Sequence, residues 1–261
     1  MTNEDSDNGR RTRMAFDIGM YDGADTLYYL ESGFRVIAVE ANPNLIEMAS
    51  QRFDKHIRSG ALKLLNVAIG PTRGTLELVV CGTDIGSSSI FAERLATRFP
   101  IGRFTIPSIT FEDLLSEHGP PDFIKIDIEG ADKMCVQALT PTTAPAYLSF
   151  EAHSDMEELV RHANSVGYRR FKLINQTNFL CLQNQEKVSF RLSRRIIRAL
   201  GYRDPAFARR AGREFLLGHS SGPAPWESDG RWYDADRILS DWNRAAAVGR
   251  TTGWYDVHAA R

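Results

Sequence analysis

Short apolar runs alternate with amphipathic segments along the first 190 residues of the chain. Apolar runs bounded by turn residues predict strands, and apolar side chains three or four positions apart predict helices. The alternation predicts a mostly parallel α/β sheet with right-handed crossovers. We expect strands at 14–19, 35–41, 62–70, 74–81, 123–128 and 146–153, and a final pair of strands over 168–183. We expect helices at 24–33, 43–53, 111–118, 131–140 and 155–167.

One predicted strand, in "PDFIKIDIEGAD" (121–132), carries three charges among its apolar residues. Successive side chains of a strand point to opposite faces, so Lys125, Asp127 and Glu129 share one face and the isoleucines the other. An edge strand with one solvated face would explain this pattern. A central strand whose charged face ends at an active site would explain it equally well, and the pattern alone leaves both interpretations open.

The first predicted strand ends in "DIGMYDGAD", with Gly19 and Gly23 in a D-x-G-x-x-x-G arrangement. Ligands of open α/β sheets bind beyond the carboxyl ends of the strands. A dinucleotide site uses a further glycine to approach the pyrophosphate, whereas position 21 is a tyrosine. The turn therefore favours a nucleoside without phosphates, such as S-adenosylmethionine (SAM), whose amino group Asp17 could orient.

Glu40 ends the second predicted strand, 21 residues after Gly19. A carboxylate at this spacing can accept hydrogen bonds from both ribose hydroxyls. NAD and SAM both contain ribose, so Glu40 locates a nucleoside site without choosing between them.

Four stretches together resemble the FkbM-type SAM-dependent methyltransferases: 16–23, 39–43, 66–70 and, most specifically, 121–132. The resemblance spans about residues 14–175, and "GSSSI" (86–90) and "FEAH" (150–153) extend it. It implies a class I methyltransferase fold, a Rossmann-like seven-stranded sheet that is mostly parallel with its last strand antiparallel. It also implies O-methylation of sugars or natural products. Carried over residue by residue, it places Asp17, Gly19 and Gly23 in the SAM turn, Glu40 on the ribose, and Val67 and Ala68 beside the adenine.

Acidic residues and one histidine are expected to meet where two neighbouring strands end. Asp127 and Glu129 end one strand, and Glu151 and His153 end the next. Glu129 could equally be a first-turn acid of the following helix. Methyl transfer to a hydroxyl requires alignment and removal of a proton, which makes His153 the candidate general base. Asp127, Glu151 and His153 could instead hold Mg²⁺ or Mn²⁺, and the sequence does not decide whether a metal is used.

Composition narrows the function classes. The chain has 261 residues, 43% of them hydrophobic, and a formal net charge of −1. This balance gives no indication of a nucleic-acid partner. We expect a cytoplasmic protein, because no signal peptide or transmembrane run is recognised and the three cysteines suggest no disulfide framework.

The predicted organisation is a flexible N-terminus (1–13), a SAM-binding domain (14–190) and a C-terminal helical or loop extension (191–261). Residues 191–213 contain eight arginines and a single acid, Asp204, which suits a solvated helix face or the docking of an anionic acceptor or membrane surface. We expect the extension, with segment 82–105, to shape the acceptor site. All four tryptophans lie in the extension: Trp226, Trp232, Trp242 and Trp254.

The leading hypothesis is a SAM-dependent O-methyltransferase acting on a hydroxyl of a sugar, glycolipid or natural product. The alternatives are an NAD-linked oxidoreductase, which Tyr21 disfavours, and a catalytically silent SAM-binding protein. The acceptor, the oligomeric state and the role of the arginine-rich segment are not determined by the sequence.

Overall fold

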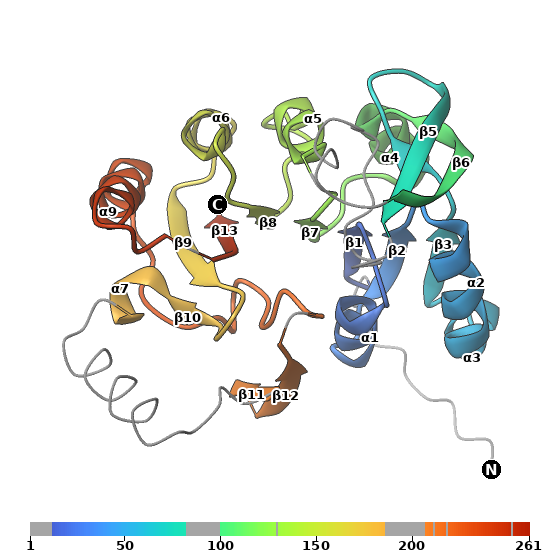
Figure 1. Cartoon of the computed structure of the whole chain (residues 1–261), viewed down its shortest axis with the longest axis horizontal. Helices are drawn as coiled ribbons and strands as arrows, with labels where there is room; N and C mark the ends of the chain where they lie inside the picture. Colours follow the sequence, from blue (N-terminus) through green and yellow to red (C-terminus); the bar gives the residue numbers. More distant parts are fainter. Residues whose placement is uncertain are drawn as a thin grey trace, which may run out of the picture.

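A computed structural model describes residues 12–81, 100–128, 130–185, 207–210, 212–217, 219–251 and 253–261. Within these ranges an eight-stranded mixed sheet has the order β10-β9-β13-β8-β7-β1-β2-β3 (Figure 1). Its strands are β1 (Met14–Ile18), β2 (Arg35–Val39), β3 (Leu62–Leu65), β7 (Phe123–Ile126), β8 (Tyr147–Glu151), β9 (Arg170–Asn175), β10 (Leu180–Cys181) and β13 (Tyr255–Ala260).

Most of this sheet is parallel, and its last strand is antiparallel. Pairing is parallel from β8 through β7, β1 and β2 to β3. The final strand of the chain, β13, lies between β8 and β9 and is antiparallel to both. The predicted fold class is thus confirmed, with the two-residue β10 added at the edge beside β9.

The position of β13 changes the predicted division of the chain. A boundary at residue 190 would assign residues 255–260 to an appended extension, but β13 is fully buried inside the sheet. The sequence "YDVHAA" does not predict this strand, because Asp256 and His258 give it the polarity of a loop. Only insertion between β8 and β9 buries these residues, and this pairing depends on segments about 100 residues away.

Strand β7 is central, which decides between the two interpretations of its charges. It pairs with β1 on one side and β8 on the other, and Lys125 is only 4% exposed. The edge-strand interpretation is wrong. Because a buried charge is costly unless it is paired, the charged face of β7 must find partners within the protein or in a ligand.

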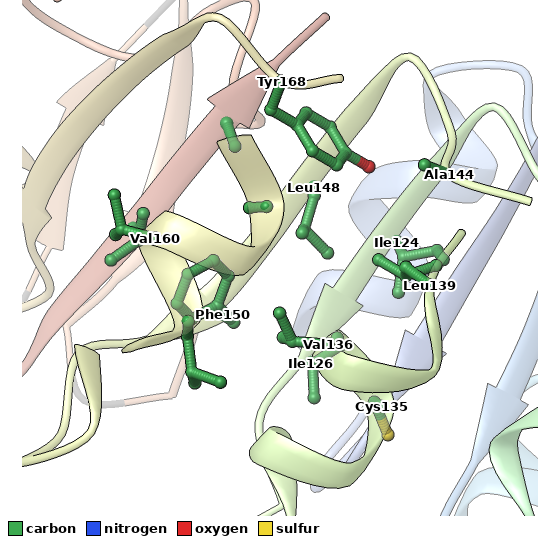
Figure 2. Packing of buried hydrophobic residues seen from close by; sticks show 14 of the residues in the cluster. Ile124, Ile126, Cys135, Val136, Leu139, Ala144, Leu148, Phe150, Val160 and Tyr168 are labelled. Carbon is green, nitrogen blue, oxygen red and sulfur yellow. The ribbon is translucent and has the colours of Figure 1, made fainter. Parts of the chain in front are cut away.

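Helices cover the two faces of the sheet unequally. Four of the longer described helices pack on one face, where residues such as Ile124, Leu148 and Phe150 form the main core (Figures 1 and 2). They are α4 (Phe111–His118), α5 (Asp132–Ala138), α6 (Met156–Ser165) and α9 (Ala235–Ala247). On the other face, α1 (Ala24–Glu31) packs over β1 and β2, and Phe215, Ala224 and Trp226 of the C-terminal region join the same core.

Smaller elements complete the described part. The run 62–70 is not one strand as predicted: β3 ends at Leu65, and β4 (Ala68–Ile69) belongs to a separate sheet with β5 (Gly74–Cys81) and β6 (Pro100–Ile109). The remaining elements are α2 (Pro43–Arg52), α3 (Asp54–Arg58), α7 (Leu182–Gln185) and the hairpin of β11 (Phe207–Arg210) and β12 (Arg213–Leu216). Most of the arginine-rich segment, and most of 82–105, lie outside the described residues.

Among the described helices, none has the length and hydropathy needed to cross a membrane.

Candidate active site

Residues 19–23 form a tight turn between β1 and α1, as predicted. Gly19 and Gly23 have positive φ values of 83° and 79°, which glycine adopts without strain. A Cβ atom on Gly19 would lie 1.8 Å from the carbonyl oxygen of Asp127, and one on Gly23 would lie 2.6 Å from the Phe53 ring. Both glycines are therefore required by close packing inside the protein, against the end of β7 and the end of α2.

Glu40 holds this turn from the end of β2. Its Oε2 accepts a hydrogen bond from the backbone N–H of Tyr21 at 2.9 Å, and its Oε1 accepts one from Asn42 at 2.8 Å. Tyr21 has a left-handed φ of 53°, a strain of order 1 kcal/mol that the surrounding contacts must support. Burial raises the pKa of Glu40, although these backbone donors oppose the rise. A carboxylate has about four lone-pair positions, so two remain for a ligand.

Val67 and Ala68 directly follow Asn66, whose side chain bonds to the backbone at Glu40. The Asn66 side chain donates hydrogen bonds to the carbonyl oxygens of Glu40 and Ala41, at 3.0 and 3.1 Å. Val67 is half-buried and Ala68 is buried. The structure therefore brings the predicted adenine-bordering residues next to the predicted ribose-binding residue, while their role remains a prediction.

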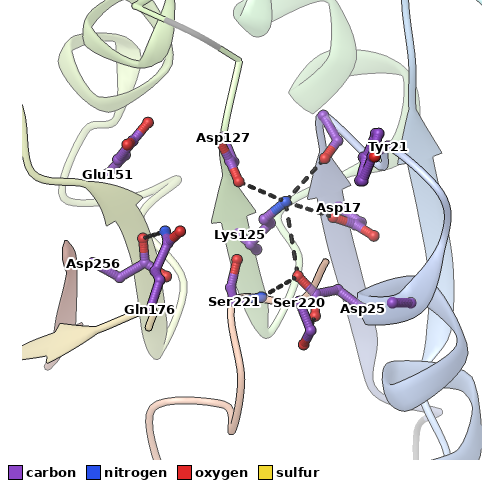
Figure 3. Close-up of polar contacts among 12 residues, drawn as sticks. Asp17, Tyr21, Asp25, Lys125, Asp127, Glu151, Gln176, Ser220, Ser221 and Asp256 are labelled. Carbon is purple, nitrogen blue, oxygen red and sulfur yellow. Dashed lines mark hydrogen bonds and ion pairs between the residues drawn. The ribbon is translucent and has the colours of Figure 1, made fainter. Parts of the chain in front are cut away.

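Lys125 is the centre of a buried charge cluster (Figure 3). Its Nζ donates a hydrogen bond to the carbonyl oxygen of Gly19 at 2.9 Å. It also lies 3.4 Å from a carboxylate oxygen of Asp127, 3.6 Å from Asp17 and 3.9 Å from Asp25. Burial disfavours the charged lysine, but the carboxylates outweigh it and hold the pKa of Lys125 above its usual value. The lysine thus ties β7 to the turn after β1.

Asp17 lies completely buried below this turn. Its Oδ2 accepts a hydrogen bond from Thr26 at 2.6 Å, while its Oδ1 has no hydrogen-bond partner among the described residues. Burial raises the pKa of Asp17 to about 7, because the loss of hydration exceeds the attraction of Lys125. The contact of Asp17 with a SAM amino group stays a prediction.

Asp127 stands at the carboxyl end of β7, where the predicted reaction centre lies. Its side chain is 33% exposed and points toward Lys125 (Figure 3). Glu129 lies outside the described residues. Asp132, at the start of α5, is 2% exposed and accepts a hydrogen bond from the N–H of Gly130 at 3.1 Å. Burial and the charge of Asp127 raise the pKa of Asp132 to about 6.

Glu151 and His153 meet as predicted, just beyond β8. The Nε2 atom of His153 lies 2.9 Å from a carboxylate oxygen of Glu151, which is an ion-pair distance, although the geometry of the contact is not that of a hydrogen bond. Glu151 is buried, whereas the His153 side chain is 23% exposed. A histidine oriented by a buried carboxylate can accept a proton on its other ring nitrogen, Nδ1.

Asp256 adds a carboxyl group that the sequence did not indicate. It is directly opposite Glu151 in the antiparallel pairing of β13 with β8, and it is 2% exposed. Its Oδ1 accepts a hydrogen bond from Gln176 at 2.6 Å, and its Oδ2 has no hydrogen-bond partner in the described ranges. Burial, and then the charge of Asp127, raise the pKa of Asp256 well above its usual value.

The metal candidates Asp127, Glu151 and His153 do not form a metal-binding group. Within the described parts of the chain, no three His, Cys, Asp or Glu side chains are placed to hold a metal ion. Glu151 instead pairs with His153, and Asp127 with Lys125.

A comparison of the sequence with models of known protein families identifies the family of this chain. The family model described as "Methyltransferase FkbM domain" matches residues 17–203. This range contains the glycine turn, Glu40, the whole of β7 and the Glu151–His153 pair.

The chain belongs to the FkbM methyltransferase family.

Solved structures similar to this FkbM domain share little sequence with it. A methyltransferase FkbM from Methylobacillus flagellatus is 15% identical with a TM-score of 0.43, and the match covers 62% of this chain and 40% of that one. A precorrin-6y C5,15-methyltransferase from Geobacter metallireducens is 10% identical with a TM-score of 0.42, covering 96% and 80% of the two chains. This chain therefore spans less than half of the Methylobacillus protein. A search of curated proteins found no match.

A pocket of about 350 Å³ opens beside His153, between the FkbM-matched range and the residues that follow it. The end of β8, α6, α9 and the approach to β13 surround it. The residues that line it include His153, Ser154, Glu157, Trp242, Asn243 and Thr251. Its position next to the predicted base makes it the candidate acceptor pocket.

The four tryptophans do not share one site. Trp226 stacks on Phe34 with ring centroids 5.5 Å apart and packs against Phe123 and Tyr147. Those residues lie at the amino ends of strands, so Trp226 is part of the core at the opposite edge from the reaction centre. Trp232 lies over Lys172 near the start of β9. Trp226 and Trp232 therefore lie away from the predicted reaction centre, whereas Trp242 lines the pocket beside His153.

Proposed function

We propose that this protein is a SAM-dependent O-methyltransferase whose acceptor is a hydroxyl of a sugar, glycolipid or natural product. The observation that carries this proposal is the Glu151–His153 contact, placed at the same sheet edge as Asp127 and the glycine turn. Two acids and a histidine at this edge suit removal of a proton from a hydroxyl next to a bound methyl donor.

The cofactor half of the site fits a nucleoside without a diphosphate. Tyr21 occupies the turn position where a dinucleotide site needs glycine, and Glu40 keeps lone pairs for two ribose hydroxyls beside it. Gly19, Gly23 and Asp17 would shape the turn around the amino acid end of SAM, and Val67 and Ala68 would border the adenine. When bound, SAM supplies a methyl group activated by its sulfonium charge.

His153 is the proposed general base. With its Nε2 held beside the Glu151 carboxylate, its Nδ1 would accept the proton of the acceptor hydroxyl as the oxygen attacks the methyl carbon. The C–S bond breaks in the same step and its electron pair stays on sulfur. Glu151 would stabilise the imidazolium that forms, and Asp127 would position the reacting groups.

The pocket beside His153 supports a neutral, polyhydroxylated acceptor. Trp242 offers an aromatic surface for an apolar ring face, and Ser154, Asn243 and Thr251 offer hydrogen-bonding groups. Substrate sites of this size commonly bind one small molecule.

A ligand panel tests the proposal. We expect SAM and S-adenosylhomocysteine (SAH), but not NAD, to raise the melting temperature. A ligand that binds only the folded state stabilises it, and the stabilisation grows with the logarithm of the ratio of ligand concentration to Kd once that ratio is large. A shift with NAD alone would favour an oxidoreductase. Labelled methyl transfer from SAM to a panel of methyl glycosides would then separate an active enzyme from a silent binding protein.

A further inference from the structure

Residues 219–228, "HSSGPAPWES", lie beside the proposed cofactor turn although they follow the family-matched range 17–203. This segment 219–228 runs from the hairpin of β11 and β12 toward α9, along the sheet face that carries Lys125. Ser220, Ser221 and Ala224 are buried. Its contacts reach the cofactor turn from two directions.

The first contact is made by His219 with the outer side of the turn. Its Nδ1 lies 2.9 Å from a carboxylate oxygen of Asp22, and its ring lies 5.9 Å from the Tyr21 ring between centroids. Tyr21 is the turn residue with the left-handed φ, and Glu40 holds only its backbone N–H. His219 therefore contacts the side chains of both Tyr21 and Asp22, whereas Glu40 holds the turn through backbone alone.

The second contact reaches the turn from below through Asp25. The Ser220 hydroxyl donates a hydrogen bond to Asp25 Oδ1, and the backbone N–H of Ser221 donates one to Asp25 Oδ2 at 3.0 Å (Figure 3). Asp25 is 3.9 Å from Lys125, and Lys125 donates to the carbonyl oxygen of Gly19. A continuous row of polar contacts thus joins the segment to the first residue of the turn.

The segment is fixed firmly enough to transmit these restraints. Tyr28 donates a hydrogen bond to Glu227 at 2.5 Å and accepts one from the N–H of Ala224 at 3.2 Å. Gly222 has a φ of 82°, and a Cβ atom there would lie 2.4 Å from the Phe179 ring. Trp226 is packed among three aromatic rings, as described above.

We propose that segment 219–228 is a built-in part of the cofactor site, in which His219 and Ser220 are positioning residues for the Gly19–Gly23 turn. The inference rests on the proposed SAM site and adds to it a contribution from outside the family-matched range. His219 and Ser220 would raise the affinity for the cofactor by fixing Asp22, Tyr21 and Asp25. They would take no part in proton transfer.

Calorimetric titration with SAH tests this inference on the full chain. For His219→Ala and Ser220→Ala we expect Kd to rise about threefold to tenfold, as for residues that act on a site through a neighbour. His219→Gln keeps a donor for Asp22 and should recover most of the affinity. His162→Ala is the matched control, because the His162 ring also contacts an oxygen atom, in this case the carbonyl oxygen of Leu139, but on the opposite face of the sheet.

The outcomes separate the inference from the function on which it rests. Wild-type affinity in both alanine variants, with unchanged melting temperatures, would overturn the inference alone. A loss of affinity that follows the loss of melting temperature and is not restored by His219→Gln would show a purely structural role and overturn it too. If the wild-type protein itself bound neither SAM nor SAH, the proposed function and the inference would fall together. With an acceptor in hand, the KM for SAM should rise in the variants while kcat is retained.

Discussion

Asp256 of β13 is directly opposite Glu151 of β8, so two buried carboxyl groups face each other across an antiparallel strand pair. Ala152 donates its backbone N–H to the carbonyl oxygen of Tyr255 at 2.7 Å. This bond makes the Asp256–Glu151 pair a non-hydrogen-bonded one, in which opposing side chains are closest. Like charges in this position destabilise a sheet. Ionisation of Asp256 beside Glu151 therefore costs stability, and the folded protein favours the protonated form of Asp256.

We therefore expect Asp256→Asn to raise the melting temperature, and to raise it more at pH 8 than at pH 4. The folded protein holds the Asp256 proton above the ordinary pKa of 3.8, where the unfolded chain releases it, so wild-type stability falls as pH rises. Asparagine removes that dependence. Each kcal/mol gained should appear as about 2–4 °C in a thermal unfolding series. Asp236→Asn is the control, since that side chain is 91% exposed; an equal gain in the two variants would argue against the buried pair.

Glu40→Ala should abolish tight SAH binding. The variant loses both proposed ribose contacts and the support for the Tyr21 N–H. A charge-assisted hydrogen bond contributes about 1.5–3 kcal/mol, so Kd should rise at least tenfold in calorimetry. Glu47→Ala, on the exposed surface of α2, should bind as the wild type does. Unchanged affinity in a folded Glu40→Ala protein would remove Glu40 from the cofactor site.

His153→Ala should slow methyl transfer by about 10²–10⁴-fold while leaving SAH affinity unchanged, because the proposed base acts on the acceptor. Glu151→Gln should lower the rate as well, since it weakens the orientation of the imidazole. Steady-state kinetics with an acceptor found in the glycoside panel, or by mass spectrometry of co-purified ligands, would measure both. A fully active His153→Ala enzyme would require another base.

Asp127→Asn keeps the shape of the side chain and removes its charge. Lys125 retains Asp17 and Asp25 as partners, so we expect SAH affinity to fall no more than about fivefold. Turnover should fall at least tenfold, about 1.4 kcal/mol in the activation barrier. Asp122→Asn, just before the amino end of the same strand, is the control for a nonspecific effect of charge on β7. Normal turnover in Asp127→Asn would leave Asp127 with a structural role only.

Trp242→Ala should weaken acceptor binding, measured as KM for the acceptor, without changing SAH affinity. Trp226→Ala should have the opposite profile, with a lower melting temperature and little change in acceptor KM, because Trp226 fills the core between Phe34, Phe123 and Tyr147. If the two substitutions raised acceptor KM equally, the pocket beside His153 would not be the acceptor pocket.

The sequence by itself determined the local elements of the proposed cofactor site. The glycine turn, Glu40 and the charged strand 123–126 are local features, because each follows from strand, turn and helix signals within a few residues. The convergence of Glu151 and His153 with Asp127 also followed from local signals, since parallel strands end at one edge of a sheet. The family resemblance rested on the same short stretches, and the family match confirmed it.

Only the tertiary structure decided what pairs with these residues. Asp25 meets Ser220 and Ser221 across more than 190 residues, and Asp256 meets Glu151 across more than 100. Such contacts leave no periodic signal in the sequence, because the polar residues that make them resemble those of an ordinary loop. Asp25 and Asp256 matter because they are buried. Asp256 is buried because β13 lies inside the sheet, and Asp25 is covered by segment 219–228.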